Sequence, residues 1–292
     1  MLLSACCRMK SARVWQADAQ ARKEILLMEG IIDFHAHAFP DQVAVSAIPY
    51  LEEEGDVKAL HDGRVFSLLE LMDRNNVEKS VVCSIATRPS QFAAILEWSR
   101  QIRSERIIPF PSFHPADPLM LEHIGMIREE GFKGIKMHPY YQRFFLDDEK
   151  LYPVYEKISK LGLILVMHTG FDIAFPRIRR CDPRQILNVV KHFPELKMVT
   201  THLGAWQQWE EVEDLLAGRK VYMDISYTLD QIDPQIARRI ILKHPKEYIL
   251  FGTDTPWSGP LETYKYLQAL DLGADREDLI LRENGLSLLE SV

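Results

Sequence analysis

Eight short runs of mainly apolar and β-branched residues recur along the chain, and segments with a helical spacing of apolar residues follow them. The runs lie at residues 31–37, 80–86, 107–113, 134–138, 163–169, 198–203, 221–226 and 248–254. Strands that alternate with helical segments are typical of parallel βα units, and strands this apolar suit a sheet buried on both faces. Eight such units predict an α/β fold of the (β/α)8 TIM-barrel class.

The segments outside this repeat define the expected domain organisation. Residues 275–290 predict closing helices, so we expect a distorted barrel with extra C-terminal helices. Residues 38–79 are expected to form a loop or a small insertion over the barrel mouth. Residues 1–27 are expected to be an N-terminal extension, either disordered or the product of an early start codon, and residues 28–292 one barrel domain. The alternative is a doubly wound open sheet, but no G-x-G-x-x-G turn follows the first strand, which disfavours a dinucleotide site.

The composition limits the classes of partner. Hydrophobic residues make up 47% and charged residues 26% of the 292-residue chain, as in ordinary soluble domains. The net charge of -7 disfavours nucleic acid and anionic membrane surfaces, and no apolar run is long enough for a membrane span. The four cysteines, Cys6, Cys7, Cys83 and Cys181, lack metal-site spacing and are expected to be free thiols. We therefore expect a cytoplasmic protein that acts on a small molecule.

Polar residues cluster at the ends of the predicted strands. They are His35, His37, Lys136, His138, His168, His202 and Asp254. In a βα barrel the carboxyl ends of the strands surround the active site. Each residue alone has a simple structural explanation, such as a hydrogen-bonded core histidine or a helix cap. Together they would bury several unpaired polar groups at one rim, and a bound metal ion would satisfy them jointly.

Five short motifs carry a resemblance to a known family. They are "DFHAH", "GIKMHP", "HTG", "HLG" and "FGTDTP", each at the end of a predicted strand. In this order the chain resembles, over residues 30–290, the amidohydrolase superfamily of metal-dependent hydrolases. It is most similar to the amidohydrolase-2 branch, which also contains decarboxylases. The resemblance implies a TIM barrel and a divalent metal, most plausibly zinc, with manganese as the alternative.

The resemblance also implies roles for individual residues. His35, His37, His168 and Asp254 would bind one divalent ion, and Asp254 would also transfer protons as a general acid–base. His202 would either orient and deprotonate the attacking water or bind a second ion.

Lys136 decides between two versions of the site. If Lys136 is carboxylated, as the resemblance allows, it would bridge two ions, and His168 and His202 would bind the second one. If it stays an ammonium group, the site is mononuclear and Lys136 would bind a substrate carboxylate. The sequence leaves both versions open.

Substrate contacts are predicted from the segments that follow the fourth and fifth strands. His138, Tyr140, Arg143 and Arg177 are the candidates, because arginine and histidine bind carboxylates and tyrosine can line a pocket. Each also has an ordinary structural explanation, as a solvated basic residue or as part of the loop packing.

Three functions remain open. The leading one is hydrolysis of an amide, ester or lactone bond of a small molecule. The second is non-oxidative decarboxylation of an aromatic or unsaturated acid by a lyase. The third is a non-catalytic barrel that binds a ligand. The family resemblance allows a homodimer or a larger homo-oligomer, since such barrels are often oligomeric.

Overall fold

All eight predicted strands form, in the predicted order. The computed structural model describes residues 19–26 and 30–292. The strands are β1 (Ile31–Ala36), β2 (Val77–Cys83), β3 (Ile107–Phe110), β4 (Gly134–Met137), β5 (Ile164–Met167), β6 (Lys197–Thr200), β7 (Tyr222–Asp224) and β8 (Ile249–Leu250). All adjacent pairs are parallel, in two sheets of order β1-β2-β3 and β4-β5-β6-β7-β8.

Hydrogen bonds cross both gaps between the two sheets. At one gap, the Lys136 N–H of β4 donates to the carbonyl of Pro111, just after β3, at 3.0 Å. At the other, the Phe34 N–H of β1 donates to the carbonyl of Phe251, just after β8, at 2.9 Å. The strands therefore follow one another around a TIM barrel, and the predicted fold class is confirmed.

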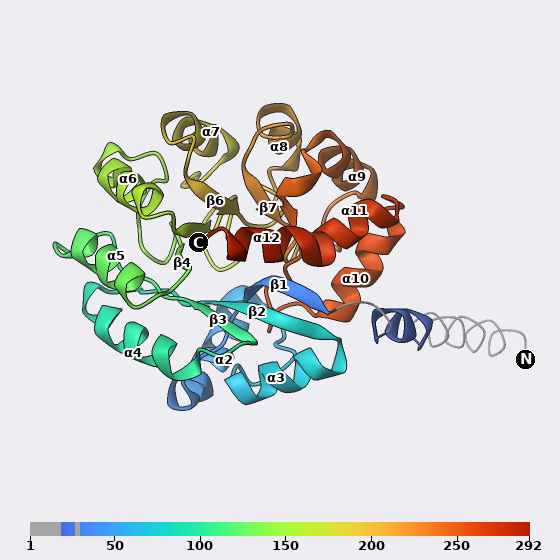
Figure 1. Ribbon diagram of the computed structural model, residues 1–292, viewed down its shortest axis with the longest axis horizontal. Coiled ribbons are helices and arrows are strands. Elements are labelled where there is room, and N and C mark those ends of the chain that lie inside the picture. Colours follow the sequence, from blue (N-terminus) through green and yellow to red (C-terminus); the bar gives the residue numbers. More distant parts are fainter. Residues whose placement is uncertain (1–18, 27–29) are drawn as a thin grey trace, which may run out of the picture.

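Helices surround this ring of strands (Figure 1). They are α2 (Asp41–Gly55), α3 (Val65–Arg74), α4 (Phe92–Ile102), α5 (Met120–Glu129), α6 (Tyr152–Lys160), α7 (Pro183–His192), α8 (Trp209–Leu215), α9 (Pro234–Lys243), α10 (Pro260–Ala269), α11 (Ala274–Asp278) and α12 (Asn284–Glu290). The segment 38–79, expected to form a loop or a small insertion, contains α2 and α3. Among the helices in the described ranges, none is both long and apolar enough to cross a membrane.

Part of the predicted N-terminal extension is helical. Residues 19–26 form a helix in which Ala21 and Ile25 are buried within the main hydrophobic core. Residues 1–18 and 27–29, which include Cys6 and Cys7, lie outside the described residues. The two described cysteines, Cys83 and Cys181, are buried free thiols.

Helix α12 closes the amino-terminal end of the barrel. Its Leu288 and Leu289 are buried in the same apolar cluster as Ile32 and Phe34 of β1. Lys133, which precedes β4, donates to the carbonyl of Leu289 at 2.8 Å. In Figure 1, α12 lies across the centre of the ring. The functional end of the barrel is therefore the opposite one, where the strands end.

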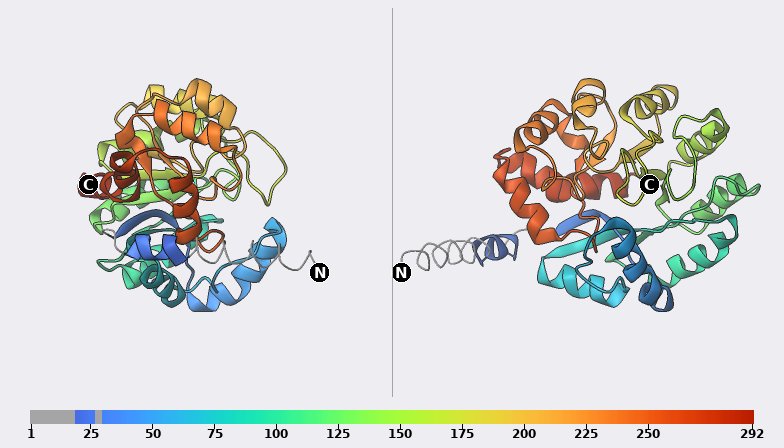
Figure 2. Two further views of the ribbon diagram at one scale, coloured as in Figure 1. Left: turned by 90° about the vertical axis from the view of Figure 1, so that its right-hand side faces the viewer. Right: turned by 180° about the vertical axis from the view of Figure 1, so that it is seen from behind.

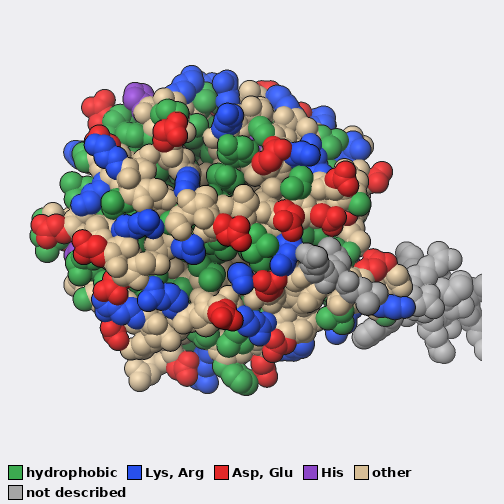
Figure 3. All heavy atoms as spheres, viewed as in Figure 1, with side chains coloured by type: hydrophobic (Ala, Val, Ile, Leu, Met, Phe, Trp, Pro, Cys, Tyr) green, Lys and Arg blue, Asp and Glu red, His purple; other side chains and the backbone are tan. Residues whose placement is uncertain are grey.

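The face that carries α12 shows no extended field of one charge. Acidic and basic side chains are interspersed over it (Figure 3).

In the left view of Figure 2, α2 projects on the side of the barrel opposite to the C-terminus. The strand ends and the residues that follow them are thus covered partly by α2.

Several strands end earlier than predicted. β6 ends at Thr200 rather than at residue 203, and β8 ends at Leu250 rather than at residue 254. His202, Leu203 and Asp254 have φ angles of 60°, 53° and 66°. A left-handed backbone cannot continue a β-strand, so most of the predicted site residues lie just after the strands.

Buried His244 gives the folded state a pH dependence that is independent of the polar rim. Its Nδ1 accepts the N–H of Gly218 at 3.3 Å, and its Nε2 donates to the carbonyl of Val221 at 2.8 Å. Burial lowers the pKa of His244 from 6.5 to about 4. Between these values the unfolded chain binds a proton that the folded chain does not, so stability falls as the pH falls from 6.5 to 4.

We expect His244→Gln to remove part of this acid sensitivity. Between pH 7 and pH 5, the loss in unfolding free energy should be smaller than in the wild type by about 2 kcal/mol. Urea denaturation at the two pH values measures this difference. The exposed His192 provides the matched control, because His192→Gln should keep the wild-type pH dependence. An unchanged slope in His244→Gln would contradict the prediction.

Candidate metal centre

One cavity at the carboxyl end of the barrel contains all the polar strand-end residues that the sequence singled out. Its volume is about 360 Å³. Its lining includes all seven of them, namely His35, His37, Lys136, His138, His168, His202 and Asp254. Parallel strands bring their carboxyl ends to one rim, which is why residues so distant in sequence meet here.

Three of these residues form a compact group of possible metal ligands. His35 lies in β1, His37 is the first residue after this strand, and Asp254 lies in the segment after β8. One nitrogen of each histidine and one oxygen of Asp254 lie within 4.8 Å of one another. Asp254 Oδ1 is 3.0 Å from His37 Nε2 and 3.4 Å from His35 Nε2. Backbone bonding fixes this arrangement, because the Asp254 N–H donates to the His35 carbonyl at 2.7 Å.

The other ring nitrogen of each histidine, Nδ1, lies within hydrogen-bond distance of an acceptor. His37 Nδ1 lies 2.9 Å from the carbonyl oxygen of Cys83, which can only accept, so Nδ1 carries the proton. His35 Nδ1 lies 3.1 Å from a carboxylate oxygen of Asp224 and 2.9 Å from Ser226 Oγ. The Nε2 atom of His37 then faces the carboxylate of Asp254, and that of His35 faces both this carboxylate and Lys136 Nζ, which lies 3.0 Å away. Such an arrangement is typical of histidines that bind a metal ion.

Charge at this group suits a cation. Burial, assisted by Lys136, lowers the pKa of His35 well below its usual range, which keeps the imidazole neutral. Burial alone would raise the pKa of Asp254, but the neighbouring His35, His37 and His202 hold it well below its usual range. The group therefore offers two imidazole nitrogens and one carboxylate oxygen.

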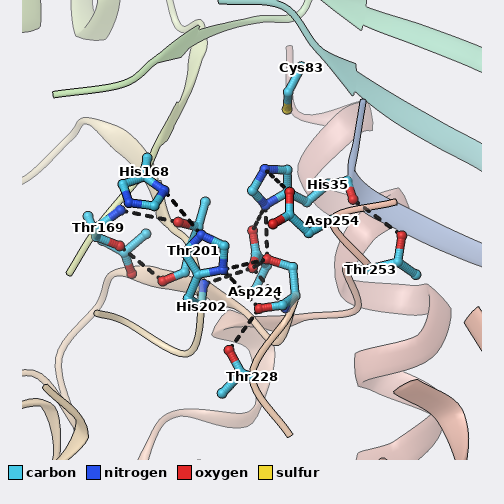
Figure 4. A network of polar contacts seen from close by, with 12 residues as sticks. His35, Cys83, His168, Thr169, Thr201, His202, Asp224, Thr228, Thr253 and Asp254 are labelled. Carbon is cyan, nitrogen blue, oxygen red and sulfur yellow. Dashed lines mark hydrogen bonds and ion pairs between the residues drawn. The ribbon is translucent and has the colours of Figure 1, made fainter. Parts of the chain in front are cut away.

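Asp224 is an organising residue that the sequence analysis missed. Its carboxylate accepts from the His202 N–H at 3.1 Å, from the Ser226 N–H at 3.0 Å and from the Ser226 hydroxyl at 2.5 Å, besides His35. Figure 4 shows Asp224 between His35 and His202. The sequence could have indicated this role through the position of Asp224 near the end of the seventh predicted strand, because polar side chains there face the rim of the barrel.

We expect Asp224→Asn to weaken metal binding without unfolding the protein. An amide must present its NH2 group to one of these donors, which tilts the His35 ring. Loss of such an outer partner costs about 10- to 100-fold in metal affinity. Competition with a chelator measures the change. The exposed Asp230 provides a control, because Asp230→Asn should leave the affinity unchanged. Wild-type affinity in Asp224→Asn would refute the assigned role.

Asp33 links two strand segments and does not belong to the group of His35, His37 and Asp254. The strand pattern predicts it on the same face as His35 and His37, but the register of β1 is irregular between Asp33 and Ala36. Its carboxylate accepts from the Thr253 N–H at 3.0 Å and from the Thr253 hydroxyl at 2.7 Å. Burial raises its pKa to about 7. Asp33 therefore ties β1 to the segment after β8, which carries Asp254.

His168 belongs to a second group on the other side of the cavity. His138, His168 and Asp172 also place ligand atoms within 4.8 Å of one another. His138 Nε2 lies 3.2 Å from Asp172 Oδ2, and the rings of His138 and His168 stack at 4.0 Å. Asp172, from the loop after β5, was not singled out from the sequence. The predicted ligand His168 thus lies in the same cavity but outside the group of His35, His37 and Asp254.

His202 connects the two groups. Its Nδ1 lies 2.9 Å from the carbonyl oxygen of Ser226, which can only accept, so Nδ1 carries a proton. His202 Nε2 lies 3.2 Å from His168 Nδ1. His202 and Asp254 both have left-handed backbones, a strained geometry for non-glycine residues that often accompanies functional sites.

Lys136 is fully buried at the cavity floor. Its exposed fraction is 1%, and its Nζ lies 3.0 Å from His35 Nε2. No described carboxylate forms an ion pair with it. A buried ammonium group without an acidic partner is costly, so Lys136 needs a substrate carboxylate or a chemical change of its own.

The structure separates the predicted substrate-binding residues. His138 lines the cavity, whereas Tyr140, Arg143 and Arg177 do not. The Tyr140 hydroxyl donates to the carbonyl of Ile178 at 2.5 Å, and Arg143 is exposed. The Arg177 guanidinium lies 5.1 Å from the centre of the Phe171 ring. The substrate-binding roles predicted for these three residues stay predictions.

Comparisons with known proteins agree with this geometry. A family model described as "Amidohydrolase" matches residues 32–289. A search of curated proteins gives no match. A solved TIM-barrel protein of uncharacterized function from Bordetella bronchiseptica shares 19% identity and a TM-score of 0.72, over 90% of this chain and 99% of that one.

Two further solved structures have assigned reactions. One is a dihydroxybenzoic acid decarboxylase from Polaromonas sp. JS666 with bound manganese, at 14% identity and a TM-score of 0.64, covering 90% of this chain and 97% of that one. The other is a putative 2-pyrone-4,6-dicarboxylic acid hydrolase from Pseudomonas putida, at 14% identity and a TM-score of 0.61, covering 91% and 99%. At these identities the likenesses establish the fold and not the reaction.

Proposed function

The chain belongs to the amidohydrolase family, a family of metal-dependent enzymes, and on this premise we propose that it hydrolyses an amide, ester or lactone bond of a small molecule. The observation that carries the proposal is the group of His35, His37 and Asp254. Both imidazoles there have their Nδ1 atoms bonded to acceptors, and their Nε2 atoms face one carboxylate oxygen.

These residues fit a divalent ion. Two imidazole nitrogens and one carboxylate oxygen are a common ligand set for zinc in catalytic sites, which leave a position open. His168, on the far side of His202, stays the predicted fourth ligand. When bound, such an ion polarises a carbonyl oxygen and makes water nucleophilic at neutral pH.

The protein's own residues would then handle the protons. The carboxylate of Asp254, 3.0 Å from His37 Nε2, would accept a proton from the attacking water. It would then pass this proton to the leaving group. His202, whose Nδ1–H is held by the Ser226 carbonyl, would orient the water through its Nε2, which lies 3.2 Å from His168 Nδ1.

Metal content tests this proposal. We expect about one equivalent of zinc or manganese per chain in protein purified without a chelator or an affinity tag, by elemental analysis. About two equivalents, with a carbon dioxide requirement, would instead support a carboxylated Lys136 and a binuclear site. No binding even after either metal is supplied would overturn the proposal. Removal of the metal by a chelator should abolish turnover and its return should restore it.

Decarboxylation is the second candidate function, and Lys136 is the observation that favours it. Its ammonium group lies buried at the cavity floor without a described acidic partner, and so would bind a substrate carboxylate. The product separates the two reactions. Release of carbon dioxide identifies the lyase, whereas incorporation of labelled water oxygen into a new carboxylate identifies hydrolysis.

A further inference from the structure

Helix α4 has two apolar faces, and the core needs only one of them. Phe92 and Leu96 are buried in the main hydrophobic core. Ala94, Ile95 and Trp98 lie on a different face of the helix, are exposed or half-buried, and line the cavity, although Trp98 also packs against the edge of the core. Positions 94, 95 and 98 follow the helical spacing that aligns side chains on one face.

Helix α2 repeats this arrangement. Its Ala44 and Ile48 are buried, whereas Val43 and Leu51 line the cavity. Val43 remains 46% exposed. The protein thus leaves aliphatic side chains of α2 and α4 uncovered within one cavity, and such surface is stabilised when an apolar ligand group covers it.

The charges of the cavity are confined to its floor. The carboxylates in the lining are Asp172 and Asp254, beside the histidines of the two ligand groups. Lys136 is the one lysine, and no arginine is present, among the described residues of the lining. The remaining polar side chains of the lining, among them Ser84, Thr87 and Gln91, are neutral, so a second anionic group on a ligand would meet no cation there.

We propose that the cavity accepts substrates with a single polar or anionic reacting end and an apolar substituent, which lies between α2 and α4. The reacting end would meet Lys136 and the metal-binding group, and the substituent would contact Val43, Leu51, Ile95 and Trp98. This inference depends on the proposed function in one respect only, namely which end of the substrate reacts. Dicarboxylates with a charge at each end are poor ligands by the same reasoning, because the second carboxylate would lose its hydration without gaining a cation as a partner.

Binding of simple monocarboxylates tests the proposal without requiring turnover. Calorimetric titration of the zinc-supplied protein with butanoate, hexanoate and octanoate should show an affinity that rises about fourfold per added methylene group. Adipate has the same number of carbons as hexanoate but two charges, and it should bind at least tenfold more weakly. An affinity that does not change with chain length, or adipate that binds as tightly as hexanoate, would overturn the proposal.

Two adjacent alanines of α4 supply a matched pair of variants. Ala94 lines the cavity, whereas Ala93 is exposed and lies outside its lining. Ala94→Trp should fill the apolar end, so that the ratio of octanoate to butanoate affinity falls at least tenfold. Ala93→Trp should keep the wild-type ratio. Equal ratios in the two variants would place the apolar chain elsewhere and refute the proposal.

These measurements separate the inference from the proposed function. A clear chain-length dependence in a protein that hydrolyses no ester or amide would support the apolar subsite and reject the reaction. Metal-dependent hydrolysis with no chain-length dependence would support the reaction and reject the subsite.

Discussion

Asp254→Asn is expected to reduce turnover by about 10²- to 10⁴-fold, the range for loss of a general acid–base, and to weaken metal binding as well. The substitution keeps the side-chain size but removes the negative charge that balances the ion. It also removes the proton acceptor that lies 3.0 Å from His37 Nε2 and 3.4 Å from His35 Nε2. Asparagine tolerates the left-handed backbone at this position, so the fold should persist.

Turnover and metal content should be measured on the same preparation, with and without added zinc. If saturating zinc restores the metal but not the turnover, Asp254 acts in proton transfer; if it restores both, Asp254 acts as a ligand only. Asp271 provides a matched control, because it is an exposed aspartate with a φ of 51°. Asp271→Asn should behave like the wild type. Full activity and metal content in Asp254→Asn would exclude the mechanism.

Gly170→Ala is expected to lower the unfolding free energy by about 3–5 kcal/mol, among the larger effects of single substitutions. Gly170 has a φ of 87°, and a Cβ atom there would lie 1.9 Å from the backbone nitrogen of Trp206. The hydrogen bond from the Trp206 N–H to the Thr169 carbonyl, at 3.0 Å, holds the two loops this close. The same contact positions His168 and His202, so the affinity of the protein for a metal ion should fall as well.

Gly162→Ala separates the close approach from the backbone conformation. Gly162 has a φ of 68°, but no heavy atom lies within 4 Å of the position a Cβ would take. This variant should lose only about 1–2 kcal/mol, the cost of a left-handed conformation in an alanine. Urea denaturation of both variants measures the difference. Similar losses in the two proteins would show that the loop contact at Trp206 does not constrain the fold.

Much of the fold follows from local pattern. The alternation of apolar runs with helical segments depends on periods of two and 3.6 residues, which a sequence displays directly. All eight strands and their order were therefore predictable. The boundaries were not, because the left-handed backbones of His202 and Asp254 depend on loop contacts and not on residue type. The two helices of segment 38–79 were not predictable individually, since α2 lies over the cavity and buries few of its residues.

Part of the candidate site also follows from the sequence. The seven polar strand-end residues meet in one cavity, because a parallel barrel gathers the carboxyl ends of all strands at one rim. The substrate-side residues were harder to predict. Tyr140, Arg143 and Arg177 lie on the expected loops, but those loops turn their side chains to the carbonyl of Ile178, to solvent and to the Phe171 ring.

The sequence by itself determined which residue types stand at the strand ends, and hence the barrel and the set of candidate ligands, since both depend on local periodicity. Only the tertiary structure decided how these residues divide into two groups and which nitrogen of each histidine faces the cavity. That choice depends on partners remote in the chain, such as Asp224, which lies 189 positions from His35. The identity of those partners is set by strand register and loop packing, and neither has a local signature.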